Sequence, residues 1–292
     1  IRHVLGGGDA LVLMPTGGGK SLCYQIPSLL RPGTGVVVSP LIALMKDQVE
    51  GLSENGIPAA YINSSLSPEQ ARNVENALLA GYIKLLYVSP ERLVSQGFQP
   101  LLKLLKISLF AIDEAHCISS WGHDFRPEYT QLRFLKEQYP DIPMLALTAT
   151  ADKLTRKDIV DQLQLRDAAW FVASFDRPNI RLTVRPGQKR FEQIVEFLKQ
   201  HPRQSGIIYC LSRRSCEELA DKLNAKGFRA AHYHAEVPQA QRSKTQEDFI
   251  NDKIPVICAT IAFGMGIDKS NVRFVIHYNL PRNLESYYQE IG

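Results

Sequence analysis

Short apolar runs alternate with longer amphipathic stretches along most of the chain. In the first half, the apolar runs predict strands at residues 10–14, 35–39, 59–62, 84–88, 108–112 and 144–147. Stretches with helical spacing lie between them, such as those at residues 21–30 and 41–52. Near-continuous apolar strands separated by helices are typical of a mostly parallel sheet that is covered by helices on both faces.

A capping signal marks the start of one of these helices. Ser67 suits the N-cap position, Pro68 suits the first helical position, and Gln70 completes a capping box. We therefore expect a helix to begin directly after Ser67.

The same alternation starts again in the second half of the chain. It predicts strands at residues 181–184, 206–210, 229–233, 255–259 and 273–277, and helices at residues 191–200, 215–226, 239–250 and from 283 onward. Residues 167–173 are interpreted as leading out of the first domain. The length of 292 residues also favours two domains, so we expect α/β domains at residues 1–168 and 169–292.

Composition and charge exclude few classes of protein. Hydrophobic residues make up 45% of the chain and charged residues 22%, which is typical of a soluble globular protein. No apolar run is long enough to cross a membrane, and no secretory signal is visible. The net charge of +4 permits nucleic-acid binding but does not argue for it. The chain begins and ends in mid-pattern, so we expect it to be part of a longer protein.

The cysteines give no sign of a disulfide framework. There are five of them, scattered along the chain, and none forms a C-x-x-C pair, so no zinc site is indicated either. We expect small buried thiols in a reducing cytoplasm.

A glycine-rich turn at residues 14–21, MPTGGGKS, joins the first strand to the first helix. Such a turn lets backbone amides converge on phosphate oxygens, here from the cofactor-binding candidates Thr16, Gly17, Gly18, Gly19 and Lys20. The Lys20 amine would reach the β- and γ-phosphates, and the hydroxyl of Ser21 would be a ligand of Mg²⁺. Met14 stands where the phosphate-loop pattern has its first glycine, so an ordinary glycine-rich turn is the alternative.

Two carboxylates follow the strand that ends at residue 112. Asp113 is placed to bind Mg²⁺, and Glu114 can accept a proton from an attacking water. The alternative is a polar strand end without a ligand. Together with the phosphate loop, however, the two carboxylates indicate hydrolysis of a nucleoside triphosphate.

At this point the chain resembles a known family. The phosphate loop, residues 113–116 (DEAH), 147–150 (LTAT) and 264–268 (GMGID) resemble the motifs of superfamily 2 helicases. Residues 117–127, CISSWGHDFRP, resemble the aromatic-rich loop of RecQ-type DNA helicases. The resemblance implies two tandem RecA-like lobes with a nucleotide cleft between them. It also implies an ATP- and Mg²⁺-dependent 3′–5′ helicase core that acts on single-stranded and partly duplex DNA in repair and recombination.

The aromatic-rich loop offers candidate DNA contacts. Trp121 and Phe125 have faces on which bases can stack, and His123 and Arg126 can contact phosphates or stack. The alternative is that the two aromatic side chains pack into the core.

The resemblance implies roles for further residues, and some of these residues also have a simpler structural explanation. His116, Thr148 and Thr150 would couple hydrolysis to DNA binding. Asp268 would contact the ribose or the other lobe, and Gln289 would be catalytic. The residues that would bind the DNA backbone are Ser39, Arg92, Ser212, Arg213 and Thr260. The alternatives are helix capping for Ser39 and Ser89, a cap before Asp152 for the threonines, and a turn for Asp268.

The resemblance also sets limits on what this chain would do. In relatives the last motif continues past the position of Gly292 into arginines that stabilise the transferred phosphoryl group, so we expect slow ATP hydrolysis by these residues alone. An adenine-recognising glutamine motif, a zinc-binding domain and a winged-helix domain would also lie outside them. We expect a location with the bacterial nucleoid, or in the nucleus of a eukaryote. An RNA helicase of the same superfamily, or a DNA-stimulated ATPase that does not unwind, are the rival functions.

Overall fold

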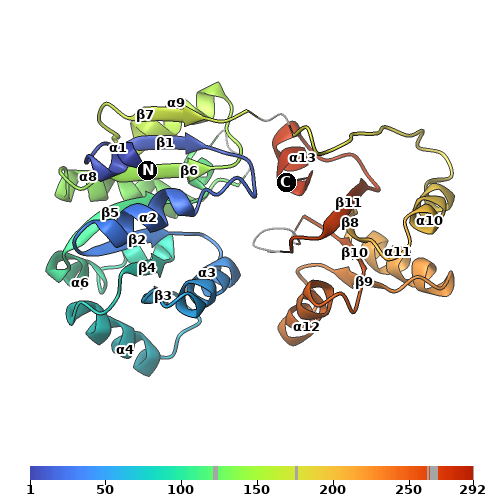
Figure 1. The fold of residues 1–292 in the computed structure, drawn as a ribbon, viewed down its shortest axis with the longest axis horizontal. Helices are drawn as coiled ribbons and strands as arrows, with labels where there is room; N and C mark the ends of the chain where they lie inside the picture. The colour runs from blue at the N-terminus through green and yellow to red at the C-terminus, as the bar shows by residue number, and fades with distance from the viewer. Residues whose placement is uncertain (121–123, 175–176, 262, 264–268, 292) are drawn as a thin grey trace. The chain divides into compact units, whose positions relative to one another are not determined.

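The structure is a computed structural model that describes residues 1–120, 124–174, 177–261, 263 and 269–291. The chain divides into two compact units, with the division after residue 175. Figure 1 shows each unit as a sheet with helices on its faces.

The first unit is built on a parallel sheet. Among the described residues it has seven strands in the order β3-β4-β2-β5-β6-β1-β7. Every pairing is parallel. The strands are β1 (Ala10–Leu13), β2 (Thr34–Val38), β3 (Ala59–Ile62), β4 (Leu85–Val88), β5 (Ile107–Ile112), β6 (Met144–Thr148) and β7 (Ala169–Val172).

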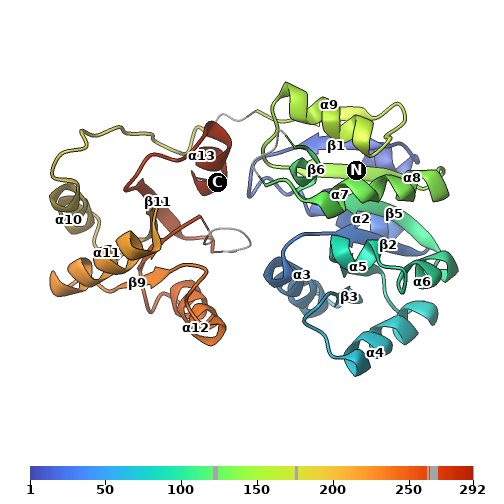
Figure 2. The same cartoon turned by 180° about the vertical axis from the view of Figure 1, so that it is seen from behind.

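Helices cover both faces of this sheet (Figures 1 and 2). On one face α1 (Arg2–Leu5), α2 (Leu22–Leu30) and α3 (Ile42–Glu54) pack on a core that includes Val12 and Val37. Leu11 and Val36, the neighbours of those residues along the strands, belong to the core on the other face. That core is covered by α4 (Pro68–Leu79), α5 (Pro90–Val94), α6 (Gln99–Leu104), α7 (Pro127–Thr130), α8 (Phe134–Gln138) and α9 (Lys153–Gln162), with 3₁₀ turns η1 (Ala115–Ile118) and η2 (Gln131–Arg133). Burial on both sides explains why the central strands are almost entirely apolar.

The predicted capping box at the start of α4 is confirmed. The Ser67 hydroxyl accepts a hydrogen bond from the Gln70 amide at 3.2 Å, and the Gln70 side chain accepts one from the Ser67 amide at 2.9 Å. Two amides at the helix start therefore have partners within the chain.

A buried ion pair fixes the start of the first strand. The Lys136 amine lies 2.8 Å from the Asp9 carboxylate, and both side chains are buried. The same carboxylate accepts hydrogen bonds from the backbone amides of Met144 and Arg166. Asp9 therefore ties β1 to the start of β6 and to the segment that leads into β7.

The second unit has a smaller parallel sheet. Its four described strands lie in the order β11-β8-β10-β9 and are β8 (Ser205–Tyr209), β9 (Ala230–Tyr233), β10 (Val256–Ala259) and β11 (Val272–His277). Helices α10 (Arg190–Gln200) and α11 (Arg213–Ala225) cover one face, and α12 (Gln239–Ile250) packs on the other. Helix α13 (Leu284–Ile291) follows β11.

The segment between the two sheets differs from the prediction. Residues 169–172, which we interpreted as leading out of the first domain, form β7 and pair with β1. The contact-based division therefore falls seven residues after the expected boundary at 168 and 169. Residues 181–184 form no strand, and Val184 is 97% exposed. Their alternating pattern suits an edge strand, but the structure places no partner strand beside them.

Two expectations about the whole chain can be compared with the structure. All five cysteines are free thiols, as expected. Among the described helices, none has the length and apolar character that a membrane crossing requires.

Candidate active site

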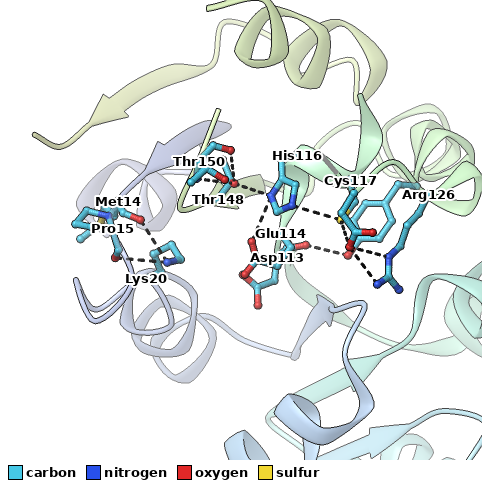
Figure 3. Close-up of polar contacts among 12 residues, drawn as sticks. Met14, Pro15, Lys20, Asp113, Glu114, His116, Cys117, Arg126, Thr148 and Thr150 are labelled. Carbon is cyan, nitrogen blue, oxygen red and sulfur yellow. Dashed lines mark hydrogen bonds and ion pairs between the residues drawn. The ribbon is translucent and has the colours of Figure 1, made fainter. Parts of the chain in front are cut away.

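The phosphate loop lies between the end of β1 and the start of α2. Gly17 and Gly19 have φ angles of +74° and +83°, a backbone conformation that residues with a Cβ rarely adopt. The Lys20 amine donates to the carbonyl oxygens of Met14 at 3.3 Å and Pro15 at 3.5 Å (Figure 3). The ammonium group is thus held over the loop by neutral carbonyls, which negatively charged phosphate oxygens can replace as partners.

Asp113 and Glu114 follow β5 at the same edge of the sheet. The Asp113 amide donates to the carbonyl of Val38 at 2.9 Å, and the Tyr129 hydroxyl donates to the Asp113 carbonyl at 2.9 Å. Only β6 separates β5 from β1 in the sheet, so the acids and the phosphate loop follow parallel strands that are two positions apart at the same edge. Ligands of open parallel sheets bind at this carboxyl edge.

The two carboxylates have raised pKa values. Burial raises the pKa of Glu114 to about 7, repulsion from Asp113 adds to the rise, and the Lys20 ammonium opposes it. Burial likewise raises the pKa of Asp113 against the attraction of Lys20. The lysine therefore lies close enough to act on both acids. A carboxylate with a pKa near neutrality is suited to accepting a proton from water.

The donor set fits a magnesium ion. Asp113 offers carboxylate oxygens, and Ser21, the residue before α2, offers a hydroxyl. Mg²⁺ prefers such hard oxygen ligands and usually keeps several waters. A divalent cation would also reduce the repulsion between the Asp113 and Glu114 carboxylates, which the charge of Lys20 offsets only in part.

A hydrogen-bond network links Glu114 to the end of β6. The His116 Nδ1 atom lies 3.3 Å from the Glu114 carboxylate and 2.9 Å from the Thr148 hydroxyl (Figure 3). That hydroxyl donates to the Thr150 carbonyl at 3.0 Å and accepts from the Thr150 amide at 3.2 Å. The Thr148 hydroxyl has one proton, which it donates to the Thr150 carbonyl. In this arrangement His116 Nδ1 is therefore the donor, and its N–H faces the Thr148 hydroxyl and the Glu114 carboxylate. The three predicted coupling residues are therefore brought together, and Asp152, not either threonine, caps α9.

The aromatic-rich loop is joined to this network through two residues that sequence reasoning missed. The Cys117 thiol lies 3.8 Å from His116 Nε2 and 3.8 Å from the Asp124 carboxylate. Arg126 donates to Asp124 at 3.2 and 3.3 Å and to the Pro40 carbonyl at 3.2 Å. The only sequence signal for this role of Asp124 is its position two residues before a candidate arginine.

The candidate DNA contacts of this loop are described in part. The Phe125 side chain is exposed, whereas the Arg126 guanidinium is already engaged with Asp124 and Pro40. Trp121 and His123 lie outside the described residues.

Two other candidates of the first unit are occupied or buried. Ser39 is 1% exposed, its hydroxyl has no partner among the described residues, and α3 begins three residues later. The capping alternative is therefore wrong for Ser39, but it is confirmed for Ser89, whose hydroxyl accepts from the amide of Arg92. The Arg92 guanidinium pairs with Glu75 at 3.1 Å and lies 5.7 Å from the ring centre of Phe98.

The remaining candidates belong to the second unit. Ser212 caps α11 by accepting from the amide of Ser215 at 3.2 Å, and the exposed Arg213 pairs with Glu236. The amide of Thr260 donates to the carbonyl of Tyr233 at 3.2 Å. Asp268 lies outside the described residues, as does the side chain of Gln289 in α13.

Comparison with protein families decides the classification of this chain. A family model described as "DEAD/DEAH box helicase" matches residues 1–159, and one described as "Helicase conserved C-terminal domain" matches residues 189–292. The chain belongs to the DEAD/DEAH box helicases. Both of its units are thus matched by helicase family models.

The chain is similar to curated proteins that are named RecQ helicases. It is 55% identical, over its whole length, to a protein of Haemophilus influenzae named ATP-dependent DNA helicase RecQ, and it covers 47% of that protein. For the RecQ protein of Bacillus subtilis the identity is 46% over 96% of the chain, which is 48% of the relative. The chain is therefore similar to RecQ helicases along its whole length, and it spans about half the length of these relatives.

Solved structures show the same fold. The structure of Mycobacterium smegmatis helicase Lhr bound to single-stranded DNA and AMP-PNP has a TM-score of 0.74, with 21% identity, and covers 100% of this chain and 42% of that one. The DEAD-box helicase Mss116 bound to single-stranded RNA has a TM-score of 0.77, with 18% identity, and covers 100% of this chain and 65% of that one. The two units are RecA-like helicase domains, as predicted.

Proposed function

We propose that this chain is the motor core of an ATP-dependent DNA helicase that moves 3′ to 5′ along single-stranded DNA and unwinds duplexes during repair and recombination. One observation carries the proposal. The Lys20 amine, the acids Asp113 and Glu114, and the bonded pair His116–Thr148 gather at one edge of the first sheet. The 55% identity to a protein named as a DNA helicase favours DNA over other polymers.

The proposed hydrolysis step assigns a task to each residue at this edge. Lys20 and the loop amides bind the phosphates of ATP, and Ser21 and Asp113 hold Mg²⁺, which supplies positive charge beside the phosphates. Glu114 orients the attacking water and accepts its proton, which its raised pKa favours. His116 then changes partners between Glu114 and Thr148 as the charge of Glu114 changes.

The proposed link to DNA runs through the aromatic-rich loop. Cys117, Asp124 and Arg126 form a chain of contacts from His116 to the loop after β2. Binding or release of DNA at Trp121, His123, Phe125 and Arg126 would shift this series of contacts and thereby the position of His116. Contacts of Ser39, Arg92, Ser212, Arg213 and Thr260 with the DNA backbone rest on the family resemblance alone. Binding should depend little on sequence and should weaken as salt rises.

The second unit has a proposed share in the reaction as well. Asp268 and Gln289 would contact ATP, which the family resemblance places in a cleft between the two lobes. We propose that the boundary of these lobes lies between the position expected from the sequence, at 168 and 169, and residue 175, since β7 pairs with β1 in the first sheet. We also propose a place of action with the DNA of the nucleoid or the nucleus.

ATP hydrolysis with and without single-stranded DNA tests the proposal, for this chain and for a version extended at both ends to the length of its RecQ relatives. We expect DNA to stimulate hydrolysis, and strand displacement from DNA duplexes but not from RNA duplexes. Displacement from RNA alone would favour the RNA helicase. DNA-stimulated hydrolysis without displacement would favour the non-unwinding ATPase.

The variant Glu114→Gln separates binding from chemistry in the same assay. It should still bind ATP, while turnover falls by about 10²–10⁴-fold because the proton acceptor is lost. Glu69→Gln, a change of an exposed acid in α4, is the matched control. Near-normal turnover of the Glu114 variant would remove this residue from the role of base.

A further inference from the structure

Two histidines and a glutamate gather in the second unit, in a place that the proposed function does not use. His234 Nε2 lies 3.0 Å from the Glu217 carboxylate. The rings of His232 and His234 are stacked, with centres 5.6 Å apart and planes inclined by 15°. One nitrogen of each histidine and one oxygen of Glu217 all lie within 4.8 Å of one another.

The fold explains why these three side chains converge. His232 lies in β9 and His234 directly after it, two residues apart, so both point to the same face of the sheet. Ala230, two residues earlier, packs in the core beneath α11, and Glu217 lies on α11. β9 is at the edge of the sheet, so the cluster forms where an edge strand meets the helix that covers it.

The surroundings leave the cluster available for a cation. The guanidinium of Arg213, one turn before Glu217 on α11, is paired with Glu236. The Glu217 side chain is 49% exposed, which gives solvent access, whereas the His234 residue is only 3% exposed.

We propose that Glu217, His232 and His234 form a binding site for a divalent transition-metal ion, with zinc as the best fit. Two imidazole nitrogens and one carboxylate oxygen are the ligand types that zinc accepts, at about 2.0–2.2 Å from the metal. Tetrahedral ligands at that radius are about 3.3 Å apart, close to the separation of His234 and Glu217. The third ligand has to approach by roughly 1–1.5 Å, and His232 is half-buried at the sheet edge, where such a movement displaces little. Water would take the fourth position.

The donor set also distinguishes this site from the proposed magnesium site. Mg²⁺ prefers oxygen ligands, whereas imidazole suits zinc, cobalt, nickel and copper. The other close histidine–acid pair of the second unit, His277 with Glu290 at 2.7 Å, is not part of such a three-residue group among the described residues. Among the described residues, a group of three side chains that could bind one ion therefore occurs at the end of β9.

Zinc titration of the 292-residue chain against a chromophoric chelator, in excess Mg²⁺ and without ATP, tests this site. We expect one equivalent of zinc to bind, and His232→Asn and Glu217→Gln each to weaken binding at least tenfold. His201→Asn, which changes a histidine of the same unit outside the cluster, should bind zinc as the unchanged chain does. Far-UV circular dichroism establishes that each variant is folded, and His232→Asn is the decisive one because His232 is the less buried histidine.

Cobalt gives a second measurement that identifies the ligands. Co²⁺ bound by nitrogen and oxygen should show visible d–d bands without the near-ultraviolet band of a thiolate ligand. A thiolate band would assign the ion to the cysteines and overturn the proposal. Equal zinc affinity of the His232→Asn variant and the unchanged chain, or loss of binding in excess Mg²⁺, would overturn it as well. Since ATP is absent, none of these outcomes depends on the helicase proposal.

Discussion

At the scale of single residues, the environment of Glu114 decides what this site can do. Its backbone is left-handed, with φ 47° and ψ 45°, a conformation that costs a residue with a side chain about 1–2 kcal/mol. This turn ends β5 and starts η1, which brings His116 back beside the Glu114 carboxylate. The strained turn and the raised pKa therefore occur at the same residue, which the proposed mechanism uses as the base.

The raised pKa of Glu114 predicts a pH-dependent effect on stability. Because the folded-state pKa of about 7 lies above that of an unfolded glutamate, ionisation opposes folding, and this penalty grows as pH rises from about 4.5 to 7. Glu114→Gln removes the charge, so it should stabilise the ligand-free protein by about 1–3 kcal/mol at pH 8 and by much less near pH 5. The lower part of this range is expected because the side chain is still 21% exposed.

Urea unfolding of the variant and the unchanged chain at the two pH values measures this difference. Glu69→Gln in α4 is the control, since it makes the same change of side chain at an exposed position. If the free energies of unfolding of Glu114→Gln and the unchanged chain differ by the same amount at both pH values, folding does not raise the pKa of the Glu114 carboxyl.

The network of His116 and Thr148 predicts a loss of coupling. Thr148→Val keeps the shape of a fully buried side chain but removes the hydroxyl that bonds His116 Nδ1 and both backbone groups of Thr150. The stimulation of ATP hydrolysis by single-stranded DNA should fall about tenfold, which corresponds to the 1–3 kcal/mol penalty of buried groups left without partners. Thr148→Ser retains the hydroxyl and should retain most of the stimulation. Equal stimulation in the two variants would exclude the hydroxyl from coupling.

The residue types of this site could be predicted from the sequence, but their mutual contacts could not. Spacing identified Lys20, Asp113 and Glu114, because strand ends and glycine turns have local sequence signals. The thiol of Cys117 and the carboxylate of Asp124 have no local signal, since their role depends on how the loop folds back toward His116. The histidines at 232 and 234 have only a weak local signal, which is an H-x-H pattern at the end of the strand predicted at residues 229–233, where side chains two residues apart point to one face.

At the scale of elements, local patterns predicted most strands well, but they missed β7 at one edge of the first sheet and predicted a strand at residues 181–184 that does not form. β5 and β6 are buried at every position and apolar except at Ser108 and Thr148, because helices cover both of their faces. β7 lies at the edge and is largely exposed, so its apolar residues 170–172 gave no clear indication of a partner. Residues 181–184 have a strand-like pattern without a partner strand. Pairing is a property of the whole sheet, which a short window of sequence does not contain.

The capping box of α4 predicts a measurable contribution of local sequence. Ser67→Ala removes the acceptor for the Gln70 amide and should destabilise the protein by about 0.5–2 kcal/mol. Hydrogen exchange of the amides in the first turn of α4 should accelerate, because they lose a protein partner. Asn73→Ala, on the exposed side of the same helix, is the control and should leave those amides protected. Unchanged exchange in the Ser67 variant would show that the cap contributes nothing in solution.

At the scale of the whole molecule, each unit has its own sheet and its own cores on both faces. Lys20, Asp113, Glu114, His116 and Thr148 all belong to the first unit, so this group of side chains is brought together without the second unit. Each unit has the size of domains that commonly fold alone.

Truncation after residue 175 or after residue 168 tests this view of the molecule and the position of its boundary. Residues 1–175 include β7, which pairs with β1 along its whole length, whereas residues 1–168 leave the edge of β1 without a partner. The longer piece should fold with a cooperative thermal transition and bind ATP in a way that Lys20→Ala abolishes. The shorter piece should melt several degrees lower, because each kcal/mol of lost stability lowers Tm by about 2–4 °C at this size. Residues 1–180 are the control for length, and they should melt together with 1–175, since residues 177–180 add no strand to the sheet. Equal melting of 1–168 and 1–175 would mean that β7 contributes nothing to the first unit, and the boundary would then move back to the position expected from the sequence.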